Sequence, residues 1–230
     1  MNQPVQQRRR SLRSFVIRGG RITCAQQAAR GEFWPNYGVD YHAGPLALEQ
    51  LFGRVAPITV EIGFGNGDHL LARAQREPER NFLGIEVHPP GVGRLLLGIA
   101  KSSLGNVRVS QHDAVEVLRD QLQPDSIDEV QILFPDPWHK KRHHKRRLVA
   151  ADFVALVASR LRPGGLLALA TDWEPYAEQM LEVLGGCGSL RNTRMDGGFA
   201  PRPESRIVTR FERRGVARGH IVRDLLWRRH

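Results

Sequence analysis

The stretch from residue 58 to residue 67 limits the fold more than any other part of this chain. Residues 58–62 (ITVEI) are mostly apolar or β-branched and predict a buried strand, after which glycine occupies every second position. An apolar helical pattern then begins at Leu70 and Leu71. Glycine has no Cβ and lets the backbone approach a ligand closely, as in α/β sheets that bind nucleotides between a strand and a helix. We therefore expect an open α/β fold with a Rossmann-like strand–loop–helix unit at this point.

Two acidic residues at predicted strand ends indicate which ligand the glycine loop takes. The spacing is G-x-G-x-G rather than the dinucleotide fingerprint G-x-G-x-x-G, and Glu61 stands where it would repel a phosphate. An acid there suits a ligand with positive charge, such as a sulfonium or an ammonium. Glu86 ends a second strand 25 residues later, where βαβ units hold a ribose diol. The pair predicts S-adenosylmethionine, and the alternative is a plain strand–helix turn without a ligand. The predicted cofactor-binding glycines are Gly63, Gly65 and Gly67.

Two further acids follow the next two predicted strands. Asp113 ends a third strand, where it either accepts from an adenine amino group or caps the helix that starts at Ala114. Asp136 follows a fourth strand over residues 127–134 and lies between two prolines, which enforce an extended strand exit. Because ligands of open α/β sheets bind outside the carboxyl ends of the strands, we expect all four acids to meet in one crevice.

Positive charge is concentrated in three zones of the chain. Residues 1–30 hold seven arginines and no acid, residues 139–147 hold six Lys/Arg and no acid, and residues 202–230 hold nine arginines and three acids. These zones sum to +19 in a chain of net charge +10, so the remainder carries −9. An acidic body with three basic zones predicts a surface that binds a polyanion such as RNA. The alternative for any one zone is a solvated charge run.

The chain lacks the features of membrane, secreted and metal-binding proteins. No run of roughly 18 apolar residues predicts a membrane-spanning helix, and the arginine-rich start has no apolar core of a secretory signal. Cys24 and Cys187 are too few for a disulfide framework, and the three histidines of residues 139–144 lack metal-ligand spacing. We expect a cytoplasmic protein without a metal ion, and the sequence leaves monomer or homodimer undecided.

The remaining segments complete an alternating α/β pattern. Residues 31–44 are rich in aromatic residues and predict a loop at the domain edge. Apolar spacing over residues 148–161 predicts a helix, and residues 166–170 predict a fifth strand. Residues 206–212 alternate in polarity, which predicts an antiparallel strand at the far side of the sheet.

Several of these motifs occur together in one known family. They are residues 61–67 (EIGFGNG), 84–88 (GIEVH), 134–143 (FPDPWHKKRH), 171–173 (TDW), 209–212 (TRFE) and 214–215 (RG). On these motifs the chain resembles the bacterial tRNA (guanine-N7-)-methyltransferase family over roughly residues 12–221. The run P-D-P-W-x-K-K-R-H is far more specific than any glycine loop.

The resemblance implies a doubly wound, S-adenosylmethionine-dependent methyltransferase that forms N7-methylguanosine in the variable loop of tRNA. It implies cofactor contacts for the four strand-end acids, with Asp136 as the catalytic residue. Substrate contacts are implied for Lys140, Asp172, Thr209, Arg210, Phe211 and Glu212, and RNA contacts for Arg142, His143, His144, Lys145, Arg146 and Arg147. Arg210 stands where lysine is usual in the family, which keeps the charge but changes the donor geometry. We expect residues 1–35 to form a basic, partly flexible arm and residues 36–230 the methyltransferase domain.

Two other classes of protein compete with this interpretation. A nicotinamide-dependent oxidoreductase would share the glycine loop, but the loop spacing and the position of Glu61 argue against it. A non-catalytic RNA-binding protein would share the basic zones, but it would not need four acids at one crevice. DNA or protein as the methyl acceptor is disfavoured because Asp136 adjoins a basic loop.

Overall fold

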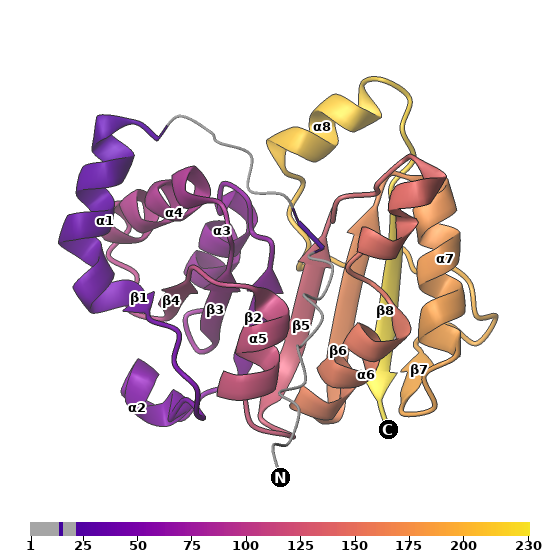
Figure 1. Ribbon diagram of the computed structural model, residues 1–230, viewed down its shortest axis with the longest axis horizontal. Coiled ribbons are helices and arrows are strands. Elements are labelled where there is room, and N and C mark those ends of the chain that lie inside the picture. Colours follow the sequence, from indigo (N-terminus) through magenta and orange to yellow (C-terminus); the bar gives the residue numbers. More distant parts are fainter. Residues whose placement is uncertain (1–13, 16–21) are drawn as a thin grey trace, which may run out of the picture.

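The structure is a computed structural model that describes residues 14–15 and 22–230. Its centre is an eight-stranded sheet in the order β1-β4-β3-β2-β5-β6-β8-β7 (Figure 1). The strands are β1 (Gly38–Val39), β2 (Ile58–Ile62), β3 (Asn81–Ile85), β4 (Val107–Ser110), β5 (Ile127–Leu133), β6 (Leu161–Thr171), β7 (Leu190–Asn192) and β8 (Arg223–Arg229). From β1 to β6 neighbouring strands are parallel, and β8 runs antiparallel to both β6 and β7. The doubly wound α/β fold is thereby confirmed.

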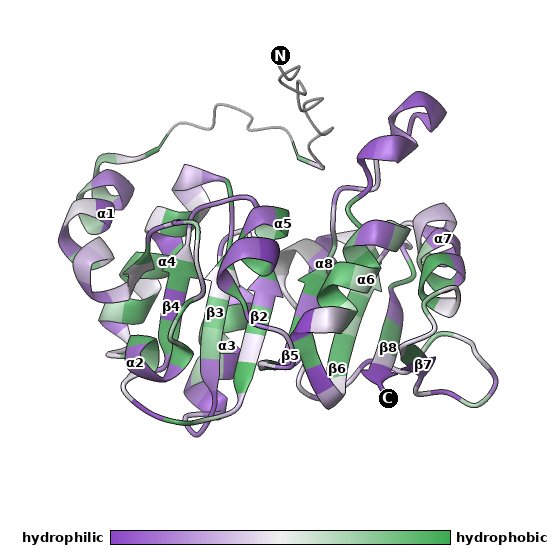
Figure 2. Cartoon of the chain, turned by 60° about the horizontal axis from the view of Figure 1, so that its bottom comes forward, coloured by the Kyte–Doolittle hydropathy of each residue, from purple (hydrophilic) through white to green (hydrophobic). Residues whose placement is uncertain are grey.

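Helices cover both faces of the sheet (Figure 1). They are α1 (Cys24–Tyr37), α2 (Leu48–Phe52), α3 (Asp68–Arg76), α4 (Pro89–Lys101), α5 (Ala114–Glu116), α6 (Ala151–Arg160), α7 (Glu174–Gly185) and α8 (Arg210–Val216). A π-helical turn (Val117–Gln121) extends α5, and a 3₁₀ helix (Lys141–Arg146) precedes α6. Two hydrophobic clusters result, one with side chains of α1, α3 and α4 and the other with side chains of α6 and α7. Figure 2 shows the corresponding pattern, with hydrophobic colour on the strands and hydrophilic colour on outward helix faces.

The expected aromatic loop from residue 31 is wrong at its start, because residues 31–37 belong to α1. Thr23 caps this helix in a reciprocal arrangement with Gln26, whose backbone N–H donates to Thr23 Oγ1 at 3.2 Å. α1 packs closely on α4 because Gly93 leaves room, since a Cβ there would lie 2.7 Å from the carbonyl oxygen of Gln26. The predictions for the rest of the N-terminal arm concern residues 1–13 and 16–21, which lie outside the described residues.

The strand predicted at residues 206–212 is also wrong. Residues 207–209 form no regular element, and α8 begins at Arg210 with Thr209 as its N-cap, whose Oγ1 accepts from the backbone N–H of Glu212 at 3.2 Å. The alternation of polarity in this segment does not reflect a strand. Arg206 turns inward and forms ion pairs with Glu212 at 2.6 Å and with Asp224 at 2.6 Å. The antiparallel strand of the sheet is β8 instead.

The sheet order brings the expected site residues to one edge. β2 lies between β3 and β5. Strands β3 and β4 are added on one side of β2, and strands β5 and β6 on the other, so the strand order reverses at β2. Ligands of open α/β sheets bind at such a switch point. The loop after β2 uses left-handed backbone at Gly63, Gly65 and Gly67, with φ of +73°, +57° and +78°. Residues with a Cβ rarely adopt these angles, which accounts for the repeated glycine. In the described part of the chain no helix is long and apolar enough to cross a membrane.

Candidate active site

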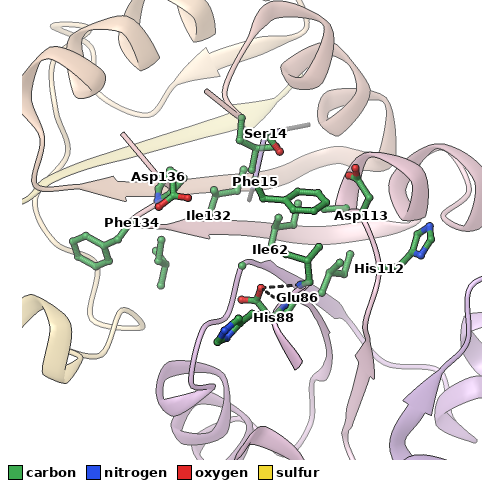
Figure 3. Close-up of a pocket in the computed structure, with 17 residues that line it drawn as sticks. Ser14, Phe15, Ile62, Glu86, His88, His112, Asp113, Ile132, Phe134 and Asp136 are labelled. Carbon is green, nitrogen blue, oxygen red and sulfur yellow. Dashed lines mark hydrogen bonds between the residues drawn. The ribbon is translucent and has the colours of Figure 1, made fainter. Parts of the chain in front are cut away.

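Two adjoining cavities lie at the carboxyl ends of the central strands. The first has a volume of about 350 Å³, and Glu86, Asp113 and Asp136 all line it (Figure 3). The second has a volume of about 320 Å³, lies over the glycine loop and is lined by Glu61. Both cavities share Gly63 and three further lining residues, so they form one continuous crevice. The structure therefore brings the four predicted acids to one crevice.

Glu86 joins the glycine loop to the end of β3. One of its carboxylate oxygens accepts from the backbone N–H of Gly65 at 2.9 Å. The other accepts from the N–H groups of Val87 at 2.7 Å and His88 at 3.0 Å (Figure 3). A carboxylate has about four acceptor positions, so a position remains for a hydroxyl donor from a ligand in the first cavity.

Glu61 and Asp113 differ in how they are held. Glu61 is only 4% exposed, and its Oε2 lies 3.0 Å from Nδ1 of His69 in α3. Asp113 caps α5, with Oδ1 accepting from the backbone N–H of Val115 at 2.9 Å, and it also lines the first cavity. The cap is thus present, and the contact of Asp113 with an adenine stays a prediction compatible with it.

The segment that carries Asp136 has an unusual backbone. Phe134 and Trp138, on either side of the Pro-Asp-Pro sequence, have φ of +54° and +49°, which is the left-handed region that bulky residues avoid. The backbone N–H of Phe134 donates to the carbonyl oxygen of Ala170 at 2.7 Å, and Arg147 Nε donates to that of Pro137 at 2.9 Å. Such strain persists only where surrounding contacts hold it, and it is concentrated at functional sites.

The basic residues after Asp136 divide into exposed and buried groups. Lys140, Arg142 and Lys145 are exposed, and the Arg146 guanidinium lies 5.2 Å from the ring centre of Trp138. Arg147 is only 5% exposed, and its Nε donates to the backbone of the segment that carries Asp136. It therefore stabilises this segment and does not present its charge to solvent. The exposed charges are therefore the ones that a phosphate backbone can reach.

The two central histidines of this basic run also differ in their surroundings. Partial desolvation and the neighbouring cations lower the pKa of His143, which favours the neutral form of its ring. His143 lies edge-on to Trp138, with ring centres 5.8 Å apart. The Nε2 atom of His144 lies 3.2 Å from Nη2 of Arg147.

The structure places the predicted substrate residues on several different elements. Thr209 lines the second cavity together with Glu61, and Lys140 is exposed. Asp172 Oδ2 lies 2.8 Å from Nδ1 of His220. Arg210 and Phe211 form the first turn of α8. Glu212 is placed differently, since it is buried and paired with the Arg206 guanidinium, so it holds α8 in position.

Sequence reasoning missed several residues of the crevice. Ser14 and Phe15, from the N-terminal arm, line the first cavity (Figure 3). Trp138 Nε1 donates to the carbonyl oxygen of Ser14 at 3.2 Å and so attaches this segment to the Asp136 loop. His112 also lines the cavity and stacks on Tyr41 with ring centres 3.8 Å apart. The only signal for Phe15 was a short apolar patch among arginines, which gives no spatial information.

Comparisons with known proteins agree with this geometry. The family described as "Putative methyltransferase" matches residues 55–225. The tRNA (guanine-N(7)-)-methyltransferase of Leifsonia xyli subsp. xyli (strain CTCB07) is 56% identical over 216 residues, which are 94% of this chain and 95% of the relative. The tRNA (guanine-N(7)-)-methyltransferase of Serratia proteamaculans (strain 568) is 52% identical over 220 residues, which are 96% of this chain and 92% of the relative.

Solved structures resemble the fold at much lower identity. The 16S rRNA methyltransferase KamB superimposes with a TM-score of 0.54 at 15% identity, covering 79% of this chain and 92% of the other. TrmN from Thermus thermophilus gives a TM-score of 0.54 at 19% identity, covering 80% of this chain and 47% of the other. At these identities the two structures establish a shared fold and no more.

Proposed function

Since this chain belongs to the tRNA (guanine-N7-)-methyltransferase family, we propose that it methylates N7 of a guanine in the variable loop of tRNA. Family membership confirms the expected enzyme class, a methyltransferase that uses S-adenosylmethionine. The observation that carries the proposal is the crevice in which four strand-end acids meet beside an exposed basic turn. A tRNA substrate would place the protein in the cytoplasm.

The residues of the crevice fit S-adenosylmethionine in chemistry and in size. Glu61 would accept from the cofactor's ammonium, Glu86 from its ribose hydroxyls and Asp113 from its adenine amino group. The loop glycines let the backbone approach the cofactor, because they carry no side chain and adopt left-handed angles that other residues avoid. The two cavities have volumes typical of ligand sites. When bound, this cofactor supplies a methyl group on a positively charged sulfur.

Guanine N7 is a lone-pair acceptor that has no proton to lose, so methyl transfer to it requires no general base. The new bond forms from the N7 lone pair, the pair of the broken carbon–sulfur bond goes to sulfur, and the purine becomes cationic. The protein's contribution is therefore to align N7 with the methyl group and to place negative charge nearby. Asp136, held at the crevice by its strained loop, would accept from the N–H edge of the guanine and stabilise the developing charge.

The exposed basic residues would bind the phosphates of the tRNA. Lys140, Arg142 and Lys145 are exposed and follow Asp136 closely in the chain, and Arg146 presents its guanidinium over Trp138. His143 would add neutral donors or acceptors. The arm of residues 1–35 and the domain of residues 36–230 remain the proposed division. The packing of α1 supports counting that helix with the domain, so the RNA-binding part of the arm would end near Thr23.

The test is methyl transfer from labelled S-adenosylmethionine to an unmodified tRNA transcript, with the product nucleoside identified. We expect N7-methylguanosine, lost when the variable-loop guanine is replaced. Asp136→Asn should lower the single-turnover rate at least tenfold while the cofactor dissociation constant changes by less than about threefold, since Asp136 acts on the guanine. Methylation of adenine, of DNA or of protein would overturn the proposal.

A further inference from the structure

The strand-end acid Glu61 contacts His69, a residue whose role none of the sequence motifs predicts. His69 lies in the first turn of α3, directly after the glycine loop, and its ring is only 3% exposed. Its Nδ1 is 3.0 Å from Oε2 of Glu61, whose side chain is also buried. An ionised carboxylate only accepts hydrogen bonds, so Nδ1 carries the proton of this hydrogen bond. One oxygen of Glu61 is thus fixed by His69, and the other remains for a ligand.

A buried carboxylate needs such a partner. Removing a carboxylate from water is costly unless the group is hydrogen-bonded, and an unheld carboxylate would rotate away from the crevice or take up a proton. Arg94, a cation that lines a small cavity together with His69, forms an ion pair with Asp68 at 3.5 Å. Among the described residues, His69 is the side chain whose hydrogen bond fixes the orientation of the Glu61 carboxylate at the edge of the second cavity.

The second nitrogen of the ring indicates that His69 is placed for more than packing. Within the described residues, Nε2 of His69 is buried and has no hydrogen-bond partner. Buried polar atoms without partners are rare, and an apolar side chain would avoid the desolvation penalty at this place. His69 also lines both the second cavity and a smaller one that Thr209 borders. Among the described residues, the hydrogen bond to Glu61 is therefore the contact that explains a histidine at this position.

We propose that His69 is a positioning residue that holds Glu61 toward the amino-acid end of S-adenosylmethionine. This inference rests on the proposed function, in which Glu61 accepts from the cofactor's ammonium. Holding the carboxylate in its binding orientation before the ligand arrives removes an ordering cost from binding. The effect should be confined to the amino-acid end, because the ribose and adenine would be held by other residues, Glu86 and Asp113, which line the first cavity.

Two ligands separate this role from a general structural one. S-adenosylhomocysteine carries the amino-acid end, whereas 5′-methylthioadenosine has the same nucleoside without it. In isothermal titration calorimetry, His69→Phe should weaken S-adenosylhomocysteine binding by about tenfold to a hundredfold, the range for a hydrogen bond to a charged group. Binding of 5′-methylthioadenosine should change by less than about twofold. The dissociation constants of the unsubstituted protein serve as the reference.

Two conservative variants test the hydrogen bond itself. The amide nitrogen of Asn occupies nearly the place of Nδ1, whereas that of Gln reaches the place of Nε2. His69→Asn should therefore retain most of the affinity for S-adenosylhomocysteine, and His69→Gln should lose it. If His69→Phe does not fold, this pair alone decides the question, with thermal unfolding as the check on both proteins.

The role of His69 and the assignment of Glu61 to the cofactor's ammonium are tested by different variants. Loss of affinity for both ligands alike, or for neither, in His69→Phe overturns the positioning role, and so does equal behaviour of the Asn and Gln variants. Glu61→Gln tests the premise, since it should weaken S-adenosylhomocysteine and leave 5′-methylthioadenosine unchanged. If Glu61→Gln discriminates the ligands and the His69 variants do not, only the role of His69 is wrong. If Glu61→Gln weakens neither or both, the assignment of Glu61 to the ammonium is wrong.

Discussion

Arg147 lies in the most basic run of the chain, yet the structure gives it an internal role that replacement by methionine can measure. Its Nε donates to the carbonyl oxygen of Pro137 at 2.9 Å, Nη1 donates to Gln179, and its guanidinium lies 4.7 Å from the ring centre of Tyr176. Two charge-assisted hydrogen bonds at roughly 1.5 kcal/mol each give about 3 kcal/mol of stability lost in Arg147→Met. The rate of methyl transfer should also fall, because the Pro137 carbonyl belongs to the loop that carries Asp136.

The assay pairs urea unfolding with the salt dependence of tRNA affinity, and Arg142→Met is the matched control. Arg142 is exposed in the same run, so its replacement should change stability by less than about 0.5 kcal/mol. It should reduce the slope of log affinity against log salt by about 0.7–0.9 if it contacts one phosphate, whereas Arg147→Met should leave that slope unchanged. A stable Arg147→Met protein with a reduced salt slope would refute the internal role and restore Arg147 as an RNA contact.

Three further replacements test other parts of the structure. Arg206→Met should cost about 3–5 kcal/mol in urea unfolding by leaving buried carboxylates unpaired. Burial already raises the pKa of Asp224, so the folded state binds its proton more tightly than the unfolded state, and the loss should be larger at pH 8 than at pH 5. Phe15→Ala should raise KM for S-adenosylmethionine in initial-rate assays, since its ring lines the first cavity; an unchanged KM would contradict that role. Gly67→Ala should lower the melting temperature through its φ of +78°, whereas Gly105→Ala, where a Cβ meets nothing within 4 Å, should not.

Local signals in the sequence were sufficient to predict the five strands β2 to β6 and the acids that follow them. The β-branched run before the glycine loop and the apolar segments after it mark strands whose ends follow from short-range chemistry. Once the strands are parallel and adjacent, Glu61, Glu86, Asp113 and Asp136 must emerge at one edge. Their convergence could therefore be predicted without knowledge of any contact between them.

Contacts between residues far apart in the chain could not be predicted in this way. Arg206 alternates with apolar neighbours as in a strand, but its partner Asp224 lies 18 residues later, and that contact turns the segment inward. Nothing local distinguishes Arg147 from the exposed Arg142, since only the packing of α7 behind the loop buries it. Phe15 reaches the crevice through a contact with Trp138 that spans 124 residues.

The same burial changes what the positive charge of this chain can do. In the zone of residues 202–230, Arg206 is internal, and Arg223 and Arg229 form ion pairs with Glu174 and Asp125. Charges neutralised within the protein release no counterions from RNA, so the salt dependence of tRNA binding reports only the exposed ones. The slope should therefore be well below what the basic residues of the three zones would give if each met a phosphate. A slope that matched their full number would mean that the internal arginines leave their partners on binding, and the fold described here would have to open to allow it.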